Sequence, residues 1–320
     1  MSRGEMLEPA PQAVQYPAAN RAVRNNLRKY WDLYLIMVPG IVYLVVFKYL
    51  PMWGIVIAFQ NYSVFTGIRA SEWVGIAHFQ EMFTNPEFFR IFRNTLLISL
   101  YKLVWGFPGP IVLAILLNEV RRAWFKRSIQ TLVYLPHFLS WVIIGGILIN
   151  VLSPTEGIVN RIIQMFGLEP VFFLADPGWF RSVLVVSDIW KEVGWGAIIY
   201  LAALAGIDPQ QYEAAIIDGA NKWRQIWHIT LPALLSTIVI LFVLRLGHVL
   251  DVGFEQIFVL YHPIVYEVSD VIETFVYRVG ITQGQFSFST AVGLFKSVIG
   301  LILVVAANRL AKKLGQSGIW

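Results

Sequence analysis

The chain has 320 residues, of which 57% are hydrophobic and only 14% are charged, and its formal net charge is +5. Soluble domains usually carry about 25% charged residues, so this chain has too few polar groups to cover a water-exposed surface. The composition excludes an ordinary soluble protein and indicates one that lies largely in lipid. The sequence contains no cysteine, which excludes disulfides, cysteine nucleophiles and cysteine-ligated metals.

The N-terminal residues do not form a cleavable signal peptide. Residues 1–30 are polar and contain several prolines, and the apolar segment that follows is too long and begins too late for a signal core. We expect 1–30 to be a cytoplasmic, partly disordered segment, with residues 1–20 disordered. A transmembrane domain then occupies 31–310, and residues 311–320 form a cytoplasmic tail.

Six apolar stretches are long enough to cross a bilayer. A spanning helix needs about 20 mostly apolar residues, because only a helix satisfies its own backbone hydrogen bonds in hydrocarbon. The six stretches lie at about 33–59, 92–118, 129–151, 182–205, 233–253 and 287–308. The sequence therefore predicts an all-α integral membrane protein with six transmembrane helices. The fourth is the least apolar, since it contains the segment DIWKEVGW.

The positions of the basic residues predict the orientation. Lysine and arginine accumulate in cytoplasmic segments of membrane proteins. If the N-terminus is inside, the outer segments carry only Arg69, Arg90, Arg161, Arg181 and Arg278. The inner segments carry Arg3, Arg21, Arg24, Arg28, Lys29, Arg121, Arg122, Lys126, Arg127, Lys222, Arg224, Arg309, Lys312 and Lys313. Both termini are therefore expected in the cytoplasm, and the basic surplus indicates topology and not nucleic-acid binding.

The inner loop 206–232, between the fourth and fifth spans, has the pattern of two short helices. Asp208 is a good N-cap and Pro209 suits the first helical position, so a helix is expected from there to Ile217. Gly219 can end it, because glycine adopts the left-handed backbone of a helix stop. A second helix is expected from about Asn221 to Thr230, with Pro232 starting the next span. A compact, bent cytoplasmic element of this kind suits a groove on a partner.

This loop resembles the EAA loop of binding-protein-dependent ABC importer permeases. That pattern requires E-A-A, a glycine after three further residues, and I-x-L-P after nine more, and the sequence matches each element. The matching residues are Glu213, Ala214, Ala215, Asp218, Gly219, Ala220, Ile229, Leu231 and Pro232. The similarity extends from about residue 30 to 320. DIWKEVGW, FVLYHPIVYEVSDVIETFVYRVG and NRLAKKLGQSGIW resemble sugar permeases for oligosaccharides and polysaccharides, the alginate importer's among them.

The resemblance implies a type I importer permease of the bacterial plasma membrane. Two homologous permeases would form a heterodimer, with two ATPase subunits inside and a solute-binding protein outside. The matching loop residues would couple this chain to an ATPase. ATP and magnesium would be bound by the ATPase subunits, since the sequence has no phosphate-binding G-x-x-x-x-G-K-[ST] motif. The chain itself would have no cofactor, metal or catalytic residue.

Charged residues inside the spans are candidates for a substrate path. Asp188, Lys191, Glu192 and Trp195 fall on one face of the fourth span. A charge at mid-bilayer costs roughly 2.5–3.5 kcal/mol on insertion scales and therefore faces water or a partner. The strip either lines the path, with Trp190 or Trp195 stacking on a sugar ring, or forms an internal ion pair in which Lys191 best reaches Asp188.

The other spans carry similar candidates. Arg245 and His248 share a face of the fifth span, with Asp251 one turn further, and a structural salt bridge is an equal alternative there. Lys102 and Lys296 are expected to snorkel or pair. His137 is expected to be packed, since no metal-ligand spacing surrounds it. The buried candidates carry slightly more positive than negative charge, which is compatible with an acidic sugar.

The sequence leaves two other functions open. A proton-coupled secondary transporter would use the intramembrane carboxylates as proton carriers, but its paired repeats and broken helices are not evident. A polytopic membrane transferase would need clustered His, Asp or Glu at the membrane surface, and no useful spacing is seen. The leading hypothesis is a transport subunit that carries sugar and has membrane lipid around it.

Overall fold

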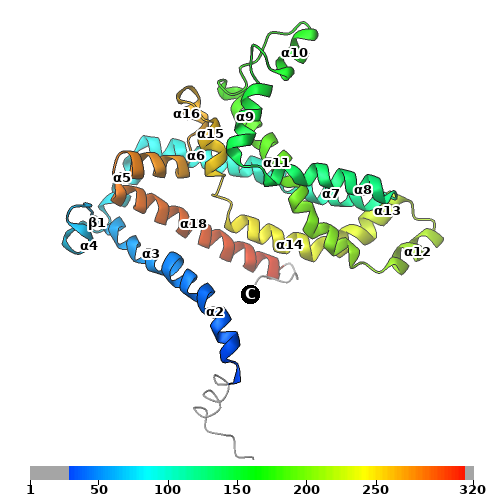
Figure 1. The fold of residues 1–320 in the computed structure, drawn as a ribbon, viewed down its shortest axis with the longest axis horizontal. Coiled ribbons are helices and arrows are strands. Elements are labelled where there is room, and N and C mark those ends of the chain that lie inside the picture. Colours follow the sequence, from blue (N-terminus) through cyan, green and yellow to red (C-terminus); the bar gives the residue numbers. More distant parts are fainter. Residues whose placement is uncertain (1–28, 314–320) are drawn as a thin grey trace, which may run out of the picture. The chain divides into compact units, whose positions relative to one another are not determined.

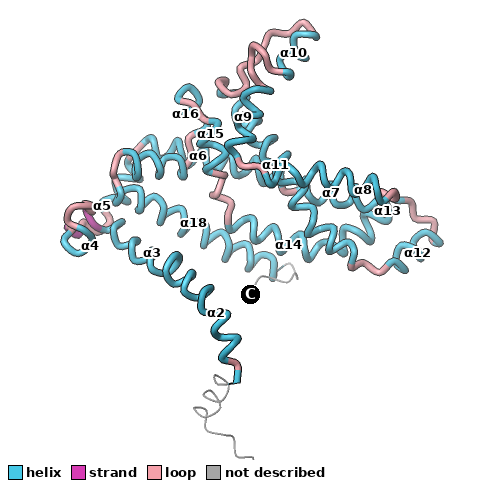
Figure 2. Tube along the Cα trace, in the orientation of Figure 1, coloured by secondary structure: helices cyan, strands magenta, loops and turns pink. Residues whose placement is uncertain are grey.

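The structure is a computed structural model that describes residues 29–313. The disordered segment expected at 1–20 and the end of the expected tail, 314–320, lie outside the described residues. The described residues divide into two units, one that ends at Ile55 and one that begins at Val56, each with its own internal contacts. Both are built almost entirely of helices, as the all-α prediction requires (Figures 1 and 2).

The first unit is a single apolar helical run. It comprises α2 (Trp31–Leu44), the π-helical turn η1 (Val45–Tyr49) and α3 (Leu50–Met52), and it continues into the 3₁₀ segment η2 (Trp53–Phe59). In α2, η1 and α3 the side chains are not buried. The run is 29 residues long and apolar enough to cross a membrane, in agreement with the predicted first span.

The second unit begins with a two-stranded antiparallel hairpin, in which Gln60 pairs with Trp73 and Asn61 with Glu72. Its first half contains β1 (Gln60–Asn61), α4 (Gly67–Ala70), β2 (Glu72–Trp73), α5 (Ala77–Thr84), α6 (Pro86–Tyr101), η3 (Lys102–Gly106), α7 (Pro108–Glu119), α8 (Ala123–Tyr134), η4 (Leu135–Phe138), α9 (Trp141–Val151) and α10 (Ile158–Met165). Its second half contains α11 (Pro177–Ala205), α12 (Pro209–Ile217), α13 (Lys222–Gln225), η5 (Ile226–Thr230), α14 (Leu231–Gly247), α15 (Phe254–Leu260), η6 (Pro263–Val265), α16 (Tyr266–Ser269), α17 (Ile272–Val276), η7 (Tyr277–Thr282) and α18 (Phe286–Lys313).

Three apolar clusters hold the second unit together. One joins α5, α6, α17 and α18 around Phe88 and Phe275. A second joins α6, α11 and α15 around Ile98 and Leu184. The third joins α7, α11 and α14 through Ala114, Ala197 and Leu234. Helix α11 contributes to two of the clusters and packs on α7, α8 and α14, so its side chains are placed by several neighbours at once (Figure 1).

Four helical runs of the described chain are long and apolar enough to cross a membrane. They are Trp31–Phe59, Pro86–Glu119, Lys222–Gly247 and Phe286–Lys313, which contain or overlap four predicted spans. Helix α11 covers the predicted fourth span and has 29 residues, but its charged residues keep it outside this set.

The third predicted span, 129–151, is not one continuous helix. The run Ala123–Phe138 and helix α9 meet at an angle of 105°. Pro136 lies in the 3₁₀ turn η4, and Ser140 begins α9 by accepting a hydrogen bond from the backbone N–H of Ile143. An apolar run does not reveal such a bend, because both arms are apolar.

Proline residues are preceded by wide helical turns in three places. The π-helical turns η1, η3 and η5 each end two residues before a proline, at Pro51, Pro108 and Pro232. Proline lacks an N–H, and its ring collides with the carbonyl four residues earlier. A π-turn moves that carbonyl aside. Helix α14 accordingly begins at Leu231 with Pro232 in its first turn, as expected, but it continues the run Lys222–Gly247 without a break.

Candidate functional site

The inner loop forms the bent helix pair that the sequence predicts. Asp208 caps α12 by accepting a hydrogen bond from the N–H of Gln210 at 2.9 Å. The helix ends at Ile217, and Gly219 follows with φ +76°. The N–H of Ala220 donates to the carbonyl of Ala215 at 2.8 Å, which closes the helix end. The second helix begins at Lys222, with Asn221 as its cap.

Side-chain hydrogen bonds fix the bend. The hydroxyl groups of Tyr212 and Thr230 are 3.0 Å apart, and the Gln225 amide donates to the carbonyl of Ala220 at 3.0 Å. Lys222 pairs with Glu119 at the end of α7, with 2.8 Å between the charged atoms. The loop is therefore a defined element that is anchored to the helix bundle.

The outer surface of this loop is apolar. Ile216 and Ile217 are 60% and 86% exposed, and Trp223 and Trp227 are 72% and 64% exposed. None of these four residues was among the predicted coupling residues, although they are large apolar side chains in a loop predicted to lie in water. Contiguous exposed apolar side chains mark interaction surfaces.

The residues of the EAA pattern surround that apolar surface or support it. Glu213, Ala214, Asp218, Gly219 and Pro232 are exposed, whereas Ala215, Ala220, Ile229 and Leu231 are partly buried. A Cβ atom at Gly219 would meet no other atom within 4 Å. Glycine is therefore needed here for its backbone angle and not for space inside this chain.

The face of α11 selected from the sequence is bound to other helices. The Asp188 carboxylate accepts a hydrogen bond from Lys102 Nζ at 2.8 Å, and Lys102 is almost fully buried. Lys102 also donates to the Val252 carbonyl at 2.9 Å and to Gln256 Oε1 at 2.5 Å. The predicted Asp188–Lys191 pair is therefore wrong. A buried cation takes the acceptors that surround it, and these come from α11 and from the segment around α15.

Lys191 stabilises the bend between α8 and α9. Its Nζ donates to the carbonyls of His137 and Leu139, both at 2.7 Å, and lies 3.4 Å from that of Pro136. Carbonyls at a broken helix can lack backbone donors. The cation supplies a donor to those of His137 and Leu139, while the Pro136 carbonyl also accepts from the N–H of Leu139 at 3.2 Å. Its side chain is only 8% exposed, so the structure does not place Lys191 on an open path.

An aromatic and ionic cluster lies beside the bend between α8 and α9. The ring of His137 stacks on Trp195, with centroids 4.5 Å apart and planes 1° apart. His137 Nδ1 lies 2.9 Å from the Glu192 carboxylate. His137 is packed, as expected, and residues 29–313 contain no group of three or more His, Asp or Glu that could hold a metal.

A cavity of about 420 Å³, which we call the polar cavity, brings most of the candidates together. Asp188, Glu192, Trp195 and Arg245 line it, as do Trp141 and Asp251. Arg245 is exposed and has no ion-pair partner among the described residues. Carboxylate and guanidinium groups beside an aromatic plane suit a polar ligand with apolar faces.

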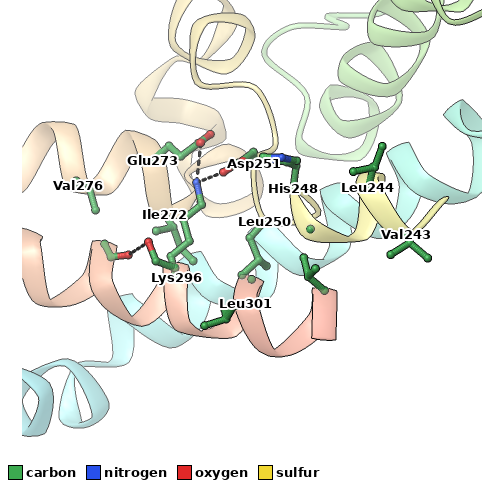
Figure 3. Close-up of a pocket in the computed structure, with 15 residues that line it drawn as sticks. Val243, Leu244, His248, Leu250, Asp251, Ile272, Glu273, Val276, Lys296 and Leu301 are labelled. Carbon is green, nitrogen blue, oxygen red and sulfur yellow. Dashed lines mark hydrogen bonds and ion pairs between the residues drawn. The ribbon is translucent and has the colours of Figure 1, made fainter. Parts of the chain in front are cut away.

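Trp190 and His248 lie elsewhere. Trp190 borders a groove formed with Leu148 and Trp179. His248 lines another cavity, of about 630 Å³, between α14, α17 and α18, and Asp251 borders both this cavity and the polar cavity (Figure 3). The structure thus brings four of the seven predicted path residues into the polar cavity.

The larger cavity contains an ion-pair network (Figure 3). Lys296 Nζ lies 2.5 Å from Asp251 and 2.7 Å from Glu273, so this lysine is paired. His248 Nδ1 lies 3.0 Å from the other Asp251 oxygen. Asp251 had been expected in the fifth span. Helix α14 ends at Gly247, however, so Asp251 belongs to a non-helical segment that follows the helix. Lys296 binds the Asp251 side chain and Lys102 binds the Val252 carbonyl, so two lysines hold this segment.

The predicted outer loop 254–286 contains a buried ion pair. Asp270 is fully buried, and Arg278 donates to it at 2.5 and 3.1 Å. Burial opposes the charge on Arg278, but the Asp270 carboxylate outweighs this effect and keeps the pKa of Arg278 above its ordinary value. The pair gives this loop a fixed shape.

Comparison with known proteins places these features in a family. Residues 106–316 match the family described as the inner membrane component of binding-protein-dependent transport systems. Protein LplB of Bacillus subtilis is 51% identical over 90% of this chain and 91% of its own. The polygalacturonan/rhamnogalacturonan transport system permease protein YteP of Bacillus subtilis is 50% identical over the full length of both chains.

A solved structure agrees. A chain of the bacterial alginate ABC transporter, crystallised with a periplasmic protein that holds an alginate pentasaccharide, has a TM-score of 0.85 and 41% identity. The match covers 92% of this chain and 99% of that chain. The chain is therefore a multi-pass membrane protein and a permease subunit without catalysis of its own, and it belongs to the family of inner-membrane components of binding-protein-dependent transport systems.

Proposed function

We propose that this chain carries oligosaccharides or polysaccharides inward across the bacterial plasma membrane. It crosses the membrane six times, with α11 and the bent α8–α9 pair counted as spans, and both termini are cytoplasmic. The relatives named for polygalacturonan, rhamnogalacturonan and alginate support this substrate class. The polar cavity supports it too, because hydroxyl and carboxyl groups need polar partners while sugar rings need an aromatic surface.

The observation that carries the proposal is the inner loop. It is a defined bent helix pair whose outer surface is apolar and lacks a partner within residues 29–313. An ATPase subunit would bury this surface, and ATP with magnesium would be bound there and not in this chain. Closure of two ATPase subunits would move the loop, and α11 and α14, which flank it, would carry that motion into the bundle.

A second, homologous permease completes the path. The polar cavity is open on one side and supplies one wall, so a heterodimer would supply the other. A solute-binding protein would dock on the outer loops, where the Asp270–Arg278 pair holds a fixed surface. Four of the predicted path residues would face the sugar in the polar cavity: Asp188, Glu192, Trp195 and Arg245. The other three lie outside that cavity and would not contact the sugar there: Trp190, Lys191 and His248.

The test is purification of a tagged chain from its own membrane, followed by reconstitution with the recovered partners. We expect an ATPase subunit and a second permease to copurify, and sugar uptake to require both ATP and the binding protein. If the chain is recovered alone and moves sugar down a proton gradient without ATP, the proposal is wrong.

A further inference from the structure

A third cavity, which we call the outer cavity, lies beside the first turns of α11. It has a volume of about 560 Å³ and is bounded by Tyr101 and Trp105 on one side and by Arg181, Ser182 and Ile189 on α11. Ile189 also lines the polar cavity, so one side chain of α11 borders both spaces. The outer cavity lies toward the end of α11 that the proposed topology places outside.

The outer cavity has positive charge and no acidic wall. The described residues that line it include no aspartate or glutamate. The Arg181 guanidinium is held in place, because it donates to the Val268 carbonyl at 3.1 Å and to Asn94 Oδ1 at 2.9 Å. Both acceptors are neutral, so the charge of Arg181 is positioned but not neutralised by them.

A second guanidinium adds to this charge. Arg93, on α6, lies close enough to Arg181 for the two charges to repel each other. Arg93 is exposed and forms no ion pair with any residue in the range 29–313. Tyr101 and Glu267 act on Arg181 in the opposite direction to Arg93. Of the two, only Arg181 lines the outer cavity, while Arg93 adds positive charge near it. A guanidinium on a cavity wall is a site for an anion, and a planar carboxylate matches its geometry.

Aromatic side chains form the opposite wall. Tyr101 and Trp105 are 38% and 67% exposed, one turn apart on the same helical run. Their rings offer an apolar surface beside polar groups. A sugar ring has the same division, with C–H bonds on its faces and oxygen atoms at its edge. A uronate residue therefore matches this cavity in both its anionic group and its ring.

We propose that the outer cavity is a binding subsite for a uronate residue of an acidic oligosaccharide, with Arg181 facing the carboxylate and Trp105 the ring, and with Arg93 adding positive charge nearby. The inference rests on the proposed function and deepens it, because it makes the substrate anionic. The outer cavity adjoins the polar cavity at Ile189, which places the two proposed binding spaces side by side along α11. An anionic phospholipid is the competing occupant, since it also combines a negative group with an apolar part.

The experiment uses the purified complete transporter and two probes, a galacturonate trisaccharide and its neutral methyl ester. We expect wild type to bind the acid more tightly than the ester. Arg181→Gln should weaken acid binding by about tenfold, the loss expected for one charged hydrogen bond, and leave ester binding unchanged. Arg93→Gln should act in the same direction, and it removes no internal hydrogen bond. Arg161→Gln, an exposed arginine on α10, is the matched control and should have no effect.

Two further measurements separate the possible failures. Equal binding of acid and ester by wild type, or unchanged acid binding in both arginine variants, overturns the subsite. Loss of bound phosphatidylglycerol from Arg181→Gln in native mass spectrometry, with unchanged acid binding, assigns the cavity to lipid and also overturns it. ATP hydrolysis that responds to the binding protein shows that the permease function is intact. If wild type lacks this response, the proposed permease function is wrong, whatever the binding measurements show.

Discussion

The backbone of Gly219 gives the sharpest test of the inner loop. Its φ of +76° lies in the left-handed region, which costs roughly 1–2 kcal/mol for an ordinary L-residue. A Cβ atom at this position would meet nothing in the chain, so the cost of Gly219→Ala is conformational. A loss of one to two kcal/mol lowers the population of the docked loop by roughly 5–30-fold.

Asparagine separates backbone strain from bulk. Asn tolerates the left-handed region better than other residues that carry a Cβ atom, although it is larger than alanine. If the turn itself matters, Gly219→Asn should retain more activity than Gly219→Ala, and Gly219→Val should retain least because its side chain is branched at Cβ. If bulk at the partner's surface matters instead, Ala should be the mildest of the three.

The assay is ATP-driven sugar uptake by proteoliposomes, together with the amount of ATPase subunit recovered on the tagged chain. We expect both quantities to fall in the order glycine, asparagine, alanine, valine. Wild-type uptake by Gly219→Ala would refute the reasoning, because a strained turn could not then be required for docking. An asparagine variant that is worse than alanine would show that size and not conformation decides.

Three further outcomes are expected. Gly194→Ala should lower the yield of folded protein, because its Cβ would overlap a backbone carbonyl of α8; normal thermal unfolding would contradict this. Lys102→Met should destabilise the bundle by about 3–5 kcal/mol, and adding Asp188→Asn should restore part of that loss. If the double variant melts in detergent at no higher a temperature than Lys102→Met alone, the proposed ion pair is refuted. In this cysteine-free chain, an impermeant maleimide should label Ile217→Cys only from inside and Leu168→Cys only from outside, and the reverse pattern would contradict the topology.

Local features of the inner loop were predictable because their causes lie within a few residues. Asp208 and Pro209 start α12, and Gly219 follows its end, as capping chemistry requires. Most apolar runs were also predictable, since hydrocarbon accepts only helices. The ends of the runs were less so. Helix α14 stops at Gly247 although apolar residues continue beyond it.

The partners of the buried charges could not be predicted from the sequence. Lys102 and Asp188 are 86 residues apart, and Lys191 binds carbonyls that are exposed only because α8 and α9 meet at a sharp angle. Spacing along one helix favoured Asp188 with Lys191, which the fold replaces by contacts between helices. A lone lysine in an apolar run must either snorkel or pair, and the sequence left both alternatives open for Lys102 and Lys296. In the structure both are paired.

The wide turn before Pro232 determines which way the rest of α14 faces. A π-turn holds one residue more than a regular turn, and one residue rotates an α-helix by about 100°. Every side chain after the turn is therefore displaced around the axis by that amount, Arg245 included. The direction of Arg245, the cation that lines the polar cavity, therefore depends on a proline more than three turns away. If that proline were substituted and one residue of η5 deleted, the turn would become regular and Arg245 would still face the polar cavity.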